Sequence, residues 1–139
     1  MLEQRIKSNV EKLTQVLNAI KLLDETEITH LYELHDLYVK AMECTGELMA
    51  DALYMKDTAY TERKHKEAEM MLESDGTIAE RQAKAELAIK EYRDDEDKGH
   101  YTYTRYKARY KSLDHKLFDI KAKRSNLERE LQQGGSKFG

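Results

Sequence analysis

The stretch that decides the fold is residues 103–131, YTRYKARYKSLDHKLFDIKAKRSNLEREL. Tyrosine, leucine and isoleucine recur in it at alternating steps of three and four, which are the a and d positions of a heptad repeat. Arg124 is the one polar residue in the series. This spacing predicts a long α-helix with an apolar seam that packs against a partner helix. The seam residues are Tyr103, Tyr106, Tyr110, Leu113, Leu117, Ile120, Leu127 and Leu131.

The same heptad frame continues towards the N-terminus, so this helix is expected over about residues 78–132. The frame is broken only in residues 93–99, RDDEDKG, where Glu96 and Gly99 fall on the seam. Clustered acids and a glycine weaken a helix, so we expect a kink or flexible joint there. Residues 134–139, GGSKFG, are expected to form a flexible tail.

Two further helices precede this one. An apolar stripe at steps of three and four predicts the first over about residues 2–22. Residues 24–29, DETEIT, then supply a capping box of Asp24 and Glu27, which predicts a second helix over about residues 26–73. Gly76 follows it, and glycine suits the left-handed position at the end of a helix.

The turn between the second and third helices lets them form an antiparallel hairpin, and the first helix packs antiparallel to the second. The expected fold is therefore all-α, with a short N-terminal helix packed on a long antiparallel helical hairpin. It is a three-helix bundle at one end and a two-helix coiled-coil arm at the other, in a single domain over residues 1–133. In this register Leu117 lies opposite residues 31–33. Tyr106 lies opposite residues 44–47.

The composition agrees with a helical fold that has a narrow core. The chain has no proline and only six glycines, so it has few of the residues that usually mark loops and β-turns. Charged residues make up 37% of the 139 residues, a share typical of long helices in contact with solvent. A thin apolar stripe buries little surface in one chain, so we expect a homo-oligomer.

No segment approaches the roughly 18 apolar residues that a membrane span requires. The first ten residues, MLEQRIKSNV, lack the apolar region of a signal peptide. From these two features we expect a cytoplasmic protein that does not interact with membranes.

Residue patterns typical of enzymes and metal sites are missing. Glu62 and His65 match the Glu-x-x-His spacing of helical di-metal sites, but no second such pair exists. The single cysteine, Cys44, lies on an apolar stripe and is interpreted as a small buried hydrophobic residue. The chain also lacks a glycine-rich phosphate loop and a nucleophile elbow. We therefore expect no enzymatic activity, no metal and no cofactor.

Charge is strongly segregated along the chain. Between Lys98 and Arg124, nine Lys or Arg residues accompany only two acids, Asp114 and Asp119. This segment carries about +7 and the rest of the chain about −10. Tyrosines alternate with the cations in its first half. Cations that attract phosphates, combined with aromatic rings that stack on bases, are typical of surfaces that bind single-stranded nucleic acid.

The heptad frame divides the residues of this segment into seam positions and outward positions. Its seam tyrosines pack inwards, so their hydroxyl groups reach only the rim of the core. Tyr101 and Phe118 fall outside the seam and are expected to point outwards, beside Arg105 and Lys111. We expect the outward aromatic residues to stack on bases and the cations to contact phosphates. The candidate nucleic-acid-binding residues are Tyr101, Arg105, Lys107, Arg109, Lys111, Lys116, Lys121 and Lys123.

A second hypothesis explains the same charges. Basic residues beside a heptad seam commonly pair with acids on a partner helix. The protein would then be a helical coiled-coil adaptor or inhibitor that binds an acidic protein and no nucleic acid. The excess of cations over acids favours nucleic acid, because pairing within one chain does not require it. Only the nucleic-acid hypothesis predicts binding to bare oligonucleotide that falls steeply with salt.

Residues 77–85, TIAERQAKA, followed by the Tyr and Lys repeats and the leucine heptads, resemble the small helical proteins of tailed-phage recombination cassettes. The chain is also similar in size and helical character to phage recombination mediators. The resemblance implies a single-stranded DNA-binding, homo-oligomeric accessory factor of phage recombination or replication. It implies that the protein helps load a recombinase, with that recombinase and a single-strand-binding protein as partners.

Overall fold

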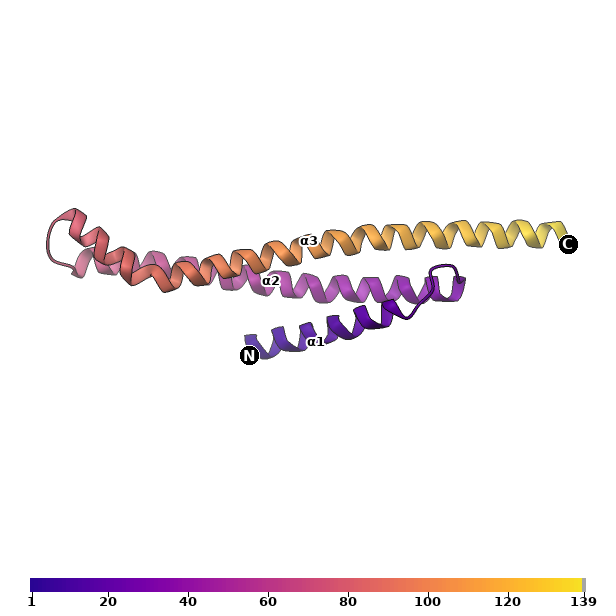
Figure 1. Ribbon diagram of the computed structural model, residues 1–139, viewed down its shortest axis with the longest axis horizontal. Helices are drawn as coiled ribbons and strands as arrows, with labels where there is room; N and C mark the ends of the chain where they lie inside the picture. The colour runs from indigo at the N-terminus through magenta and orange to yellow at the C-terminus, as the bar shows by residue number, and fades with distance from the viewer. Residues whose placement is uncertain (139) are drawn as a thin grey trace. The chain divides into compact units, whose positions relative to one another are not determined.

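The computed structural model describes the backbone of residues 1–138 and the side chains of residues 1–134. The described chain contains three α-helices and no strand (Figure 1): α1 (Leu2–Lys21), α2 (Ile28–Glu73) and α3 (Ile78–Phe138). The predicted all-α class is confirmed, with one short helix followed by two long helices that pack together. In the described part of the chain, no helix combines the length and hydrophobicity needed to cross a bilayer.

The turn between α1 and α2 differs from the predicted capping box. The Asp24 carboxylate accepts hydrogen bonds from the Thr26 backbone N–H at 2.9 Å and from Thr26 Oγ1 at 2.7 Å. The Asp24 N–H donates to His30 Nδ1 at 2.9 Å, so His30 takes the role expected of Glu27. Because residues 24–27 are used in this turn, α2 begins at Ile28, two residues later than expected.

The third helix is more continuous than the sequence indicates. It runs without interruption through residues 93–99, so the predicted joint does not break the helix. It also extends to Phe138, about six residues past its predicted end. Glycine lowers helix stability without excluding helical dihedral angles. The sequence also has no proline that would end the helix. Of the predicted flexible tail, the side chains of residues 135–138 and all of Gly139 lie outside the described residues.

The chain divides into two compact units. The three-helix unit comprises Met1–Leu48 and Tyr106–Gly139, and the two-helix unit comprises Met49–Arg105. The first contains α1 with one part each of α2 and α3, and the second contains the remaining parts of α2 and α3. They correspond to the bundle and the arm expected within one helical domain.

The core of the three-helix unit is built from large apolar side chains of all three helices. Leu31 and Ile120 are completely buried, and each such side chain stabilises the fold by about 1.5–3 kcal/mol. Half-buried apolar residues of each helix surround this core. The buried cluster consists of Leu13, Leu31, Leu34, Tyr38, Ala41, Leu48, Leu113, Leu117 and Ile120.

The two-helix unit buries mostly small residues. Ala52, Ala59 and Ala85 are buried, and Ile89 is the largest apolar side chain that is completely enclosed in this unit. Gly99 is also buried, and a Cβ atom placed on it would lie 3.0 Å from the Cα atom of Lys56. The backbones of α2 and α3 therefore approach closely at this point, which explains a glycine on the seam.

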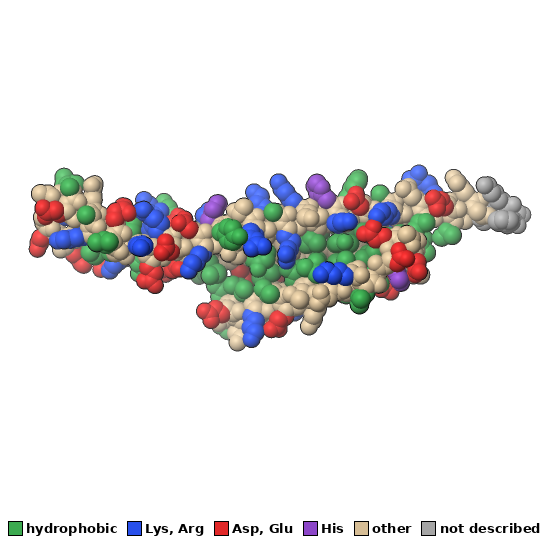
Figure 2. Space-filling model, in the orientation of Figure 1, with side chains coloured by type: hydrophobic (Ala, Val, Ile, Leu, Met, Phe, Trp, Pro, Cys, Tyr) green, Lys and Arg blue, Asp and Glu red, His purple; other side chains and the backbone are tan. Residues whose placement is uncertain are grey.

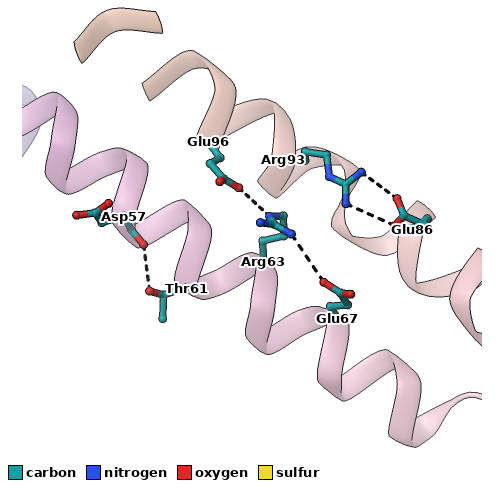
Figure 3. Close-up of polar contacts among 7 residues, drawn as sticks. All are labelled: Asp57, Thr61, Arg63, Glu67, Glu86, Arg93 and Glu96. Atoms are coloured by element: carbon teal, nitrogen blue, oxygen red, sulfur yellow. Dashed lines mark hydrogen bonds and ion pairs between the residues drawn. The ribbon is translucent and has the colours of Figure 1, made fainter. Parts of the chain in front are cut away.

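A polar contact also crosses the two-helix unit. Arg63 of α2 donates from Nε to Glu96 of α3 at 2.7 Å and lies 3.8 Å from Glu67 (Figure 3). The side chains of Arg63 and Glu96 are only 13% and 19% exposed. The acid that interrupts the apolar seam is therefore neutralised by a cation of the facing helix.

The register of α2 against α3 differs from the prediction by one to two helical turns. Tyr110, instead of Tyr106, lies beside Gly46, since a Cβ atom on Gly46 would be 3.8 Å from the Tyr110 ring. Leu117 lines a surface groove with Val39 and Met42 instead of residues 31–33. A shift of one helical turn keeps the same faces of α2 and α3 in contact. The heptad pattern therefore predicts which faces meet but does not determine the register.

Candidate nucleic-acid interface

All eight candidate residues lie on α3 and are exposed to solvent. Tyr101 and Arg105 belong to the two-helix unit. The other six belong to the three-helix unit: Lys107, Arg109, Lys111, Lys116, Lys121 and Lys123.

Tyr101 and Arg105 form a stacked pair one helical turn apart. The Arg105 guanidinium carbon lies 5.6 Å from the centroid of the Tyr101 ring, within the range of a cation–π contact. Arg105 Nη1 also donates to the Tyr101 hydroxyl at 3.4 Å. The contact holds an aromatic ring and a planar cation together on the surface, and both can stack on an unpaired base.

The six cations of the three-helix unit form rows along α3. Arg109, Lys116 and Lys123 are seven residues apart, so they follow one flank of the helix and are called the basic row. Neighbouring members are separated by about 10 Å along the helix axis. Lys107 and Lys121 follow the opposite flank. The structure therefore distributes the six cations around the exposed side of α3 instead of gathering them in one patch.

Lys111 lies between these two flanks, on the side of α3 that faces away from the core. Phe118, seven residues further on, is 73% exposed, which confirms that it points outwards. Asp114, His115 and Asp119 line a shallow surface groove with it. Two carboxylates beside this ring repel a phosphate backbone, so Phe118 is a weaker site for base stacking than Tyr101.

Five of the six candidate cations of the three-helix unit have no ion pair within the described residues. The exception is Lys123, whose ammonium group donates to the carboxylate of Glu25 in the turn between α1 and α2. The cations without an ion pair in the described residues are therefore Lys107, Arg109, Lys111, Lys116 and Lys121.

The Glu25–Lys123 contact changes the acidity of both groups. The hydrogen bond from Lys123 is the main reason why the pKa of Glu25 is below its usual value, and the nearby charge of Lys116 lowers it further. Partial burial and the charge of Asp24 act in the opposite direction. The same hydrogen bond raises the pKa of Lys123. Both groups are therefore charged at neutral pH.

Apolar surface accompanies the cations of the three-helix unit. On the face turned to the viewer in Figure 2, Lys and Arg side chains follow α3, and hydrophobic side chains fill the space between α3 and α1. Partly buried apolar residues of all three helices pack around the core, among them Ile6, Leu17, Met42 and Tyr106. The cations of α3 therefore border a partly exposed apolar surface in this unit.

The structure adds one cation that the sequence analysis left out. Arg129 is exposed and has no ion pair among the described residues, and it lies five helical turns beyond Lys111 on the same outward side. A count of charges that continues past Arg124 would have included it.

The Arg124 side chain already has partners within the protein. Its guanidinium lies 5.0 Å from the centroid of the Tyr32 ring and 3.9 Å from the Glu128 carboxylate. The Tyr32 hydroxyl donates to Glu128, and this bond is the main reason why the pKa of Tyr32 is raised. The polar interruption of the heptad seam is therefore a structural contact between α2 and α3.

The described residues contain no group of three or more His, Cys, Asp or Glu side chains that could hold a metal ion. Cys44 is half-buried, and burial raises the pKa of its thiol, which disfavours the nucleophilic thiolate.

Comparison with known proteins gives no match to a family model, to a curated protein or to a solved structure. The resemblance to phage recombination proteins therefore stays a prediction.

Proposed function

We propose that this protein is a non-enzymatic module that binds single-stranded DNA through α3. The observation that supports this most directly is the set of exposed cations of the three-helix unit that have no ion pair in the described chain. A cation without a carboxylate partner keeps its charge available for a phosphate group.

Binding would combine two contributions. Each phosphate contact with a Lys or Arg releases counterions, so affinity falls with salt by a logarithmic slope of about 0.7 for each phosphate of a single strand. Stacking of an unpaired base on an exposed aromatic ring contributes about 1–3 kcal/mol. In a duplex the bases are already stacked, so Tyr101 with its Arg105 partner favours a single strand.

The resemblance supplies a finer proposal. The protein would act as an accessory factor in phage recombination or replication and help load a recombinase, with a single-strand-binding protein as a further partner. A homo-oligomer would place several weak α3 surfaces along one strand, and their linkage would raise the overall affinity.

The test is binding of the purified protein to fluorescent single-stranded and duplex DNA across a salt series. A site variant with Arg109, Lys111, Lys116 and Lys121 changed to Glu is expected to lose binding. The matched control changes four exposed lysines elsewhere to Glu and alters the net charge equally: Lys12, Lys64, Lys84 and Lys90.

We expect the wild type to prefer single strands and the control to keep most of that binding. Circular dichroism of each variant checks that the helices are intact. Equal loss of binding in the site variant and the control would show a general charge effect and contradict a specific surface on α3.

One contact favours the alternative function, binding of an acidic protein without nucleic acid. The basic row already holds a carboxylate at one end, since Lys123 binds Glu25. Carboxylates of another protein would fit the remaining members in the same way. This alternative predicts that the folded wild type does not bind DNA even at low salt, and that the site variant loses a protein partner in a pull-down.

A further inference from the structure

We propose that Glu25 is an internal competitor for DNA, because its carboxylate occupies on Lys123 the place that a phosphate group would take. This inference rests on the proposed function and adds a form of regulation to the same surface. A carboxylate and a phosphate both present anionic oxygens to an ammonium group, so one can replace the other.

The position of Glu25 is set by the turn that carries it. Asp24 holds the Thr26 backbone N–H and hydroxyl, and His30 accepts the Asp24 N–H. The backbone on both sides of Glu25 is therefore fixed at the end of the basic row. Release of Lys123 requires only that the Glu25 side chain rotates, with no change in the helices.

Both partners are accessible to a ligand. The Glu25 and Lys123 side chains are 35% and 48% exposed, so a DNA strand on the basic row can reach Lys123. An ion pair with this exposure is weak and is screened by salt. A phosphate group of a strand held by the other cations must therefore compete with the Glu25 carboxylate for Lys123.

The effect of Glu25 extends beyond its direct partner. Lys116, the middle member of the basic row, also interacts electrostatically with the Glu25 carboxylate. One acid thus reduces the attraction of two of the three cations in the row. Arg109, at the other end of the row, has no ion pair in the described chain.

The decisive variant is Glu25→Gln, which keeps the shape of the side chain and removes its charge. The matched control is Glu33→Gln, because Glu33 is an exposed acid of α2 without an ion pair in the described residues. One additional phosphate contact steepens the salt dependence by about 0.7 logarithmic units and raises the affinity by about 5-fold at 0.1 M salt. We expect this gain in Glu25→Gln and a much smaller one in Glu33→Gln.

Two further variants assign the gain to Lys123. Lys123→Gln alone should weaken DNA binding, because it leaves the Glu25 carboxylate uncompensated at the end of the basic row. The double variant Glu25→Gln with Lys123→Gln should return to the wild-type salt slope. Each protein is measured with the same fluorescent single strand across the same salt series.

The outcomes separate this inference from the proposed function. If the wild type binds single strands but Glu25→Gln matches Glu33→Gln in affinity and slope, the competitor role is wrong and the proposed function stands. If none of the proteins binds DNA at low salt, the proposed function fails and the inference fails with it. If the double variant retains the gain, Lys123 is not the site of competition, and the proposal is overturned.

Discussion

The three-helix and two-helix units hold α2 and α3 together by different means. In the three-helix unit, leucine and isoleucine side chains fill the space between the helices. In the two-helix unit, alanine and glycine bring the backbones close, and the Arg63–Glu96 pair crosses the seam. The contact between α2 and α3 is therefore made by large apolar side chains in one unit and by closely spaced backbones in the other. Local stability is expected to follow this difference, because buried apolar area is the larger stabilising contribution.

The strongest test of the comparison removes a large side chain from the three-helix core. Ile120 is completely buried, so Ile120→Ala is expected to lower the free energy of unfolding by about 2–5 kcal/mol. Leu131→Ala is the control, because Leu131 is an exposed residue of the same seam and should change stability by about 0.5 kcal/mol or less. Urea unfolding followed by circular dichroism measures both. Similar losses in the two variants would contradict an enclosed core at Ile120.

The next test concerns the close approach in the two-helix unit. Gly99→Val places a branched side chain where even a Cβ atom would lie 3.0 Å from the Lys56 backbone, so we expect a loss of about 1–3 kcal/mol. Gly134→Ala is the control, since nothing lies within 4 Å of its added Cβ atom. The control should be neutral or gain up to about 1 kcal/mol from higher helix propensity.

Hydrogen exchange shows where the effect of Gly99→Val arises. Faster exchange should appear mainly in amides of residues 49–105, because that unit contains the clash. A Gly99→Val protein as stable as the wild type would show that the helices have room to separate, and the contrast between the units would lose its basis.

A third test compares two ion pairs within the two-helix unit. Arg63→Met leaves Glu96 partly buried without its partner, so we expect a loss of about 1–2 kcal/mol, between the values for exposed and buried pairs. Arg93→Met is the control, because the Arg93 and Glu86 side chains are 47% and 59% exposed. Its loss should be about 0.5 kcal/mol or less. Equal losses in thermal or urea unfolding would mean that the partial burial of Arg63 has no energetic consequence.

The sequence predicts the parts of this molecule that depend on periodicity. Heptad spacing from residue 78 onwards predicts α3, and the break near Gly76 predicts the hairpin, because both are local properties of the chain. Periodicity does not predict the contacts that depend on the register between two helices. Arg63 and Glu96 are 33 residues apart, and a shift of one helical turn would give each another neighbour.

The candidate interface likewise contains features that the sequence predicts and features that depend on the fold. Outward positions such as Phe118 follow from the helix period and are confirmed. The pairing of Lys123 with Glu25 follows from the fold of the turn between α1 and α2, so a count of charges along the chain treats Lys123 as free. The structure is needed to separate available cations from occupied ones, and this separation decides which residues to change in a binding experiment.

The smallest expected effect is the pH dependence of the Glu25–Lys123 pair. Because the pKa of Glu25 is lower in the folded protein, its contribution to stability is complete above its ordinary pKa of 4.5 and is lost as pH falls through the lowered value. The pKa of Lys123 is raised, so its contribution is present below 10.5 and is lost as pH rises through the higher folded value. Both groups are partly exposed, so the pair contributes at most about 1 kcal/mol.

Glu25→Gln should therefore be slightly less stable than the wild type at pH 7, and the difference should disappear once the pH is well below the lowered pKa of Glu25, where the wild-type carboxylate is protonated. Urea unfolding at several pH values measures this difference, with Glu33→Gln as the control. A difference that persists unchanged into acid would show that the substituted amide destabilises the turn itself, independently of the charge that Glu25 presents to the basic row.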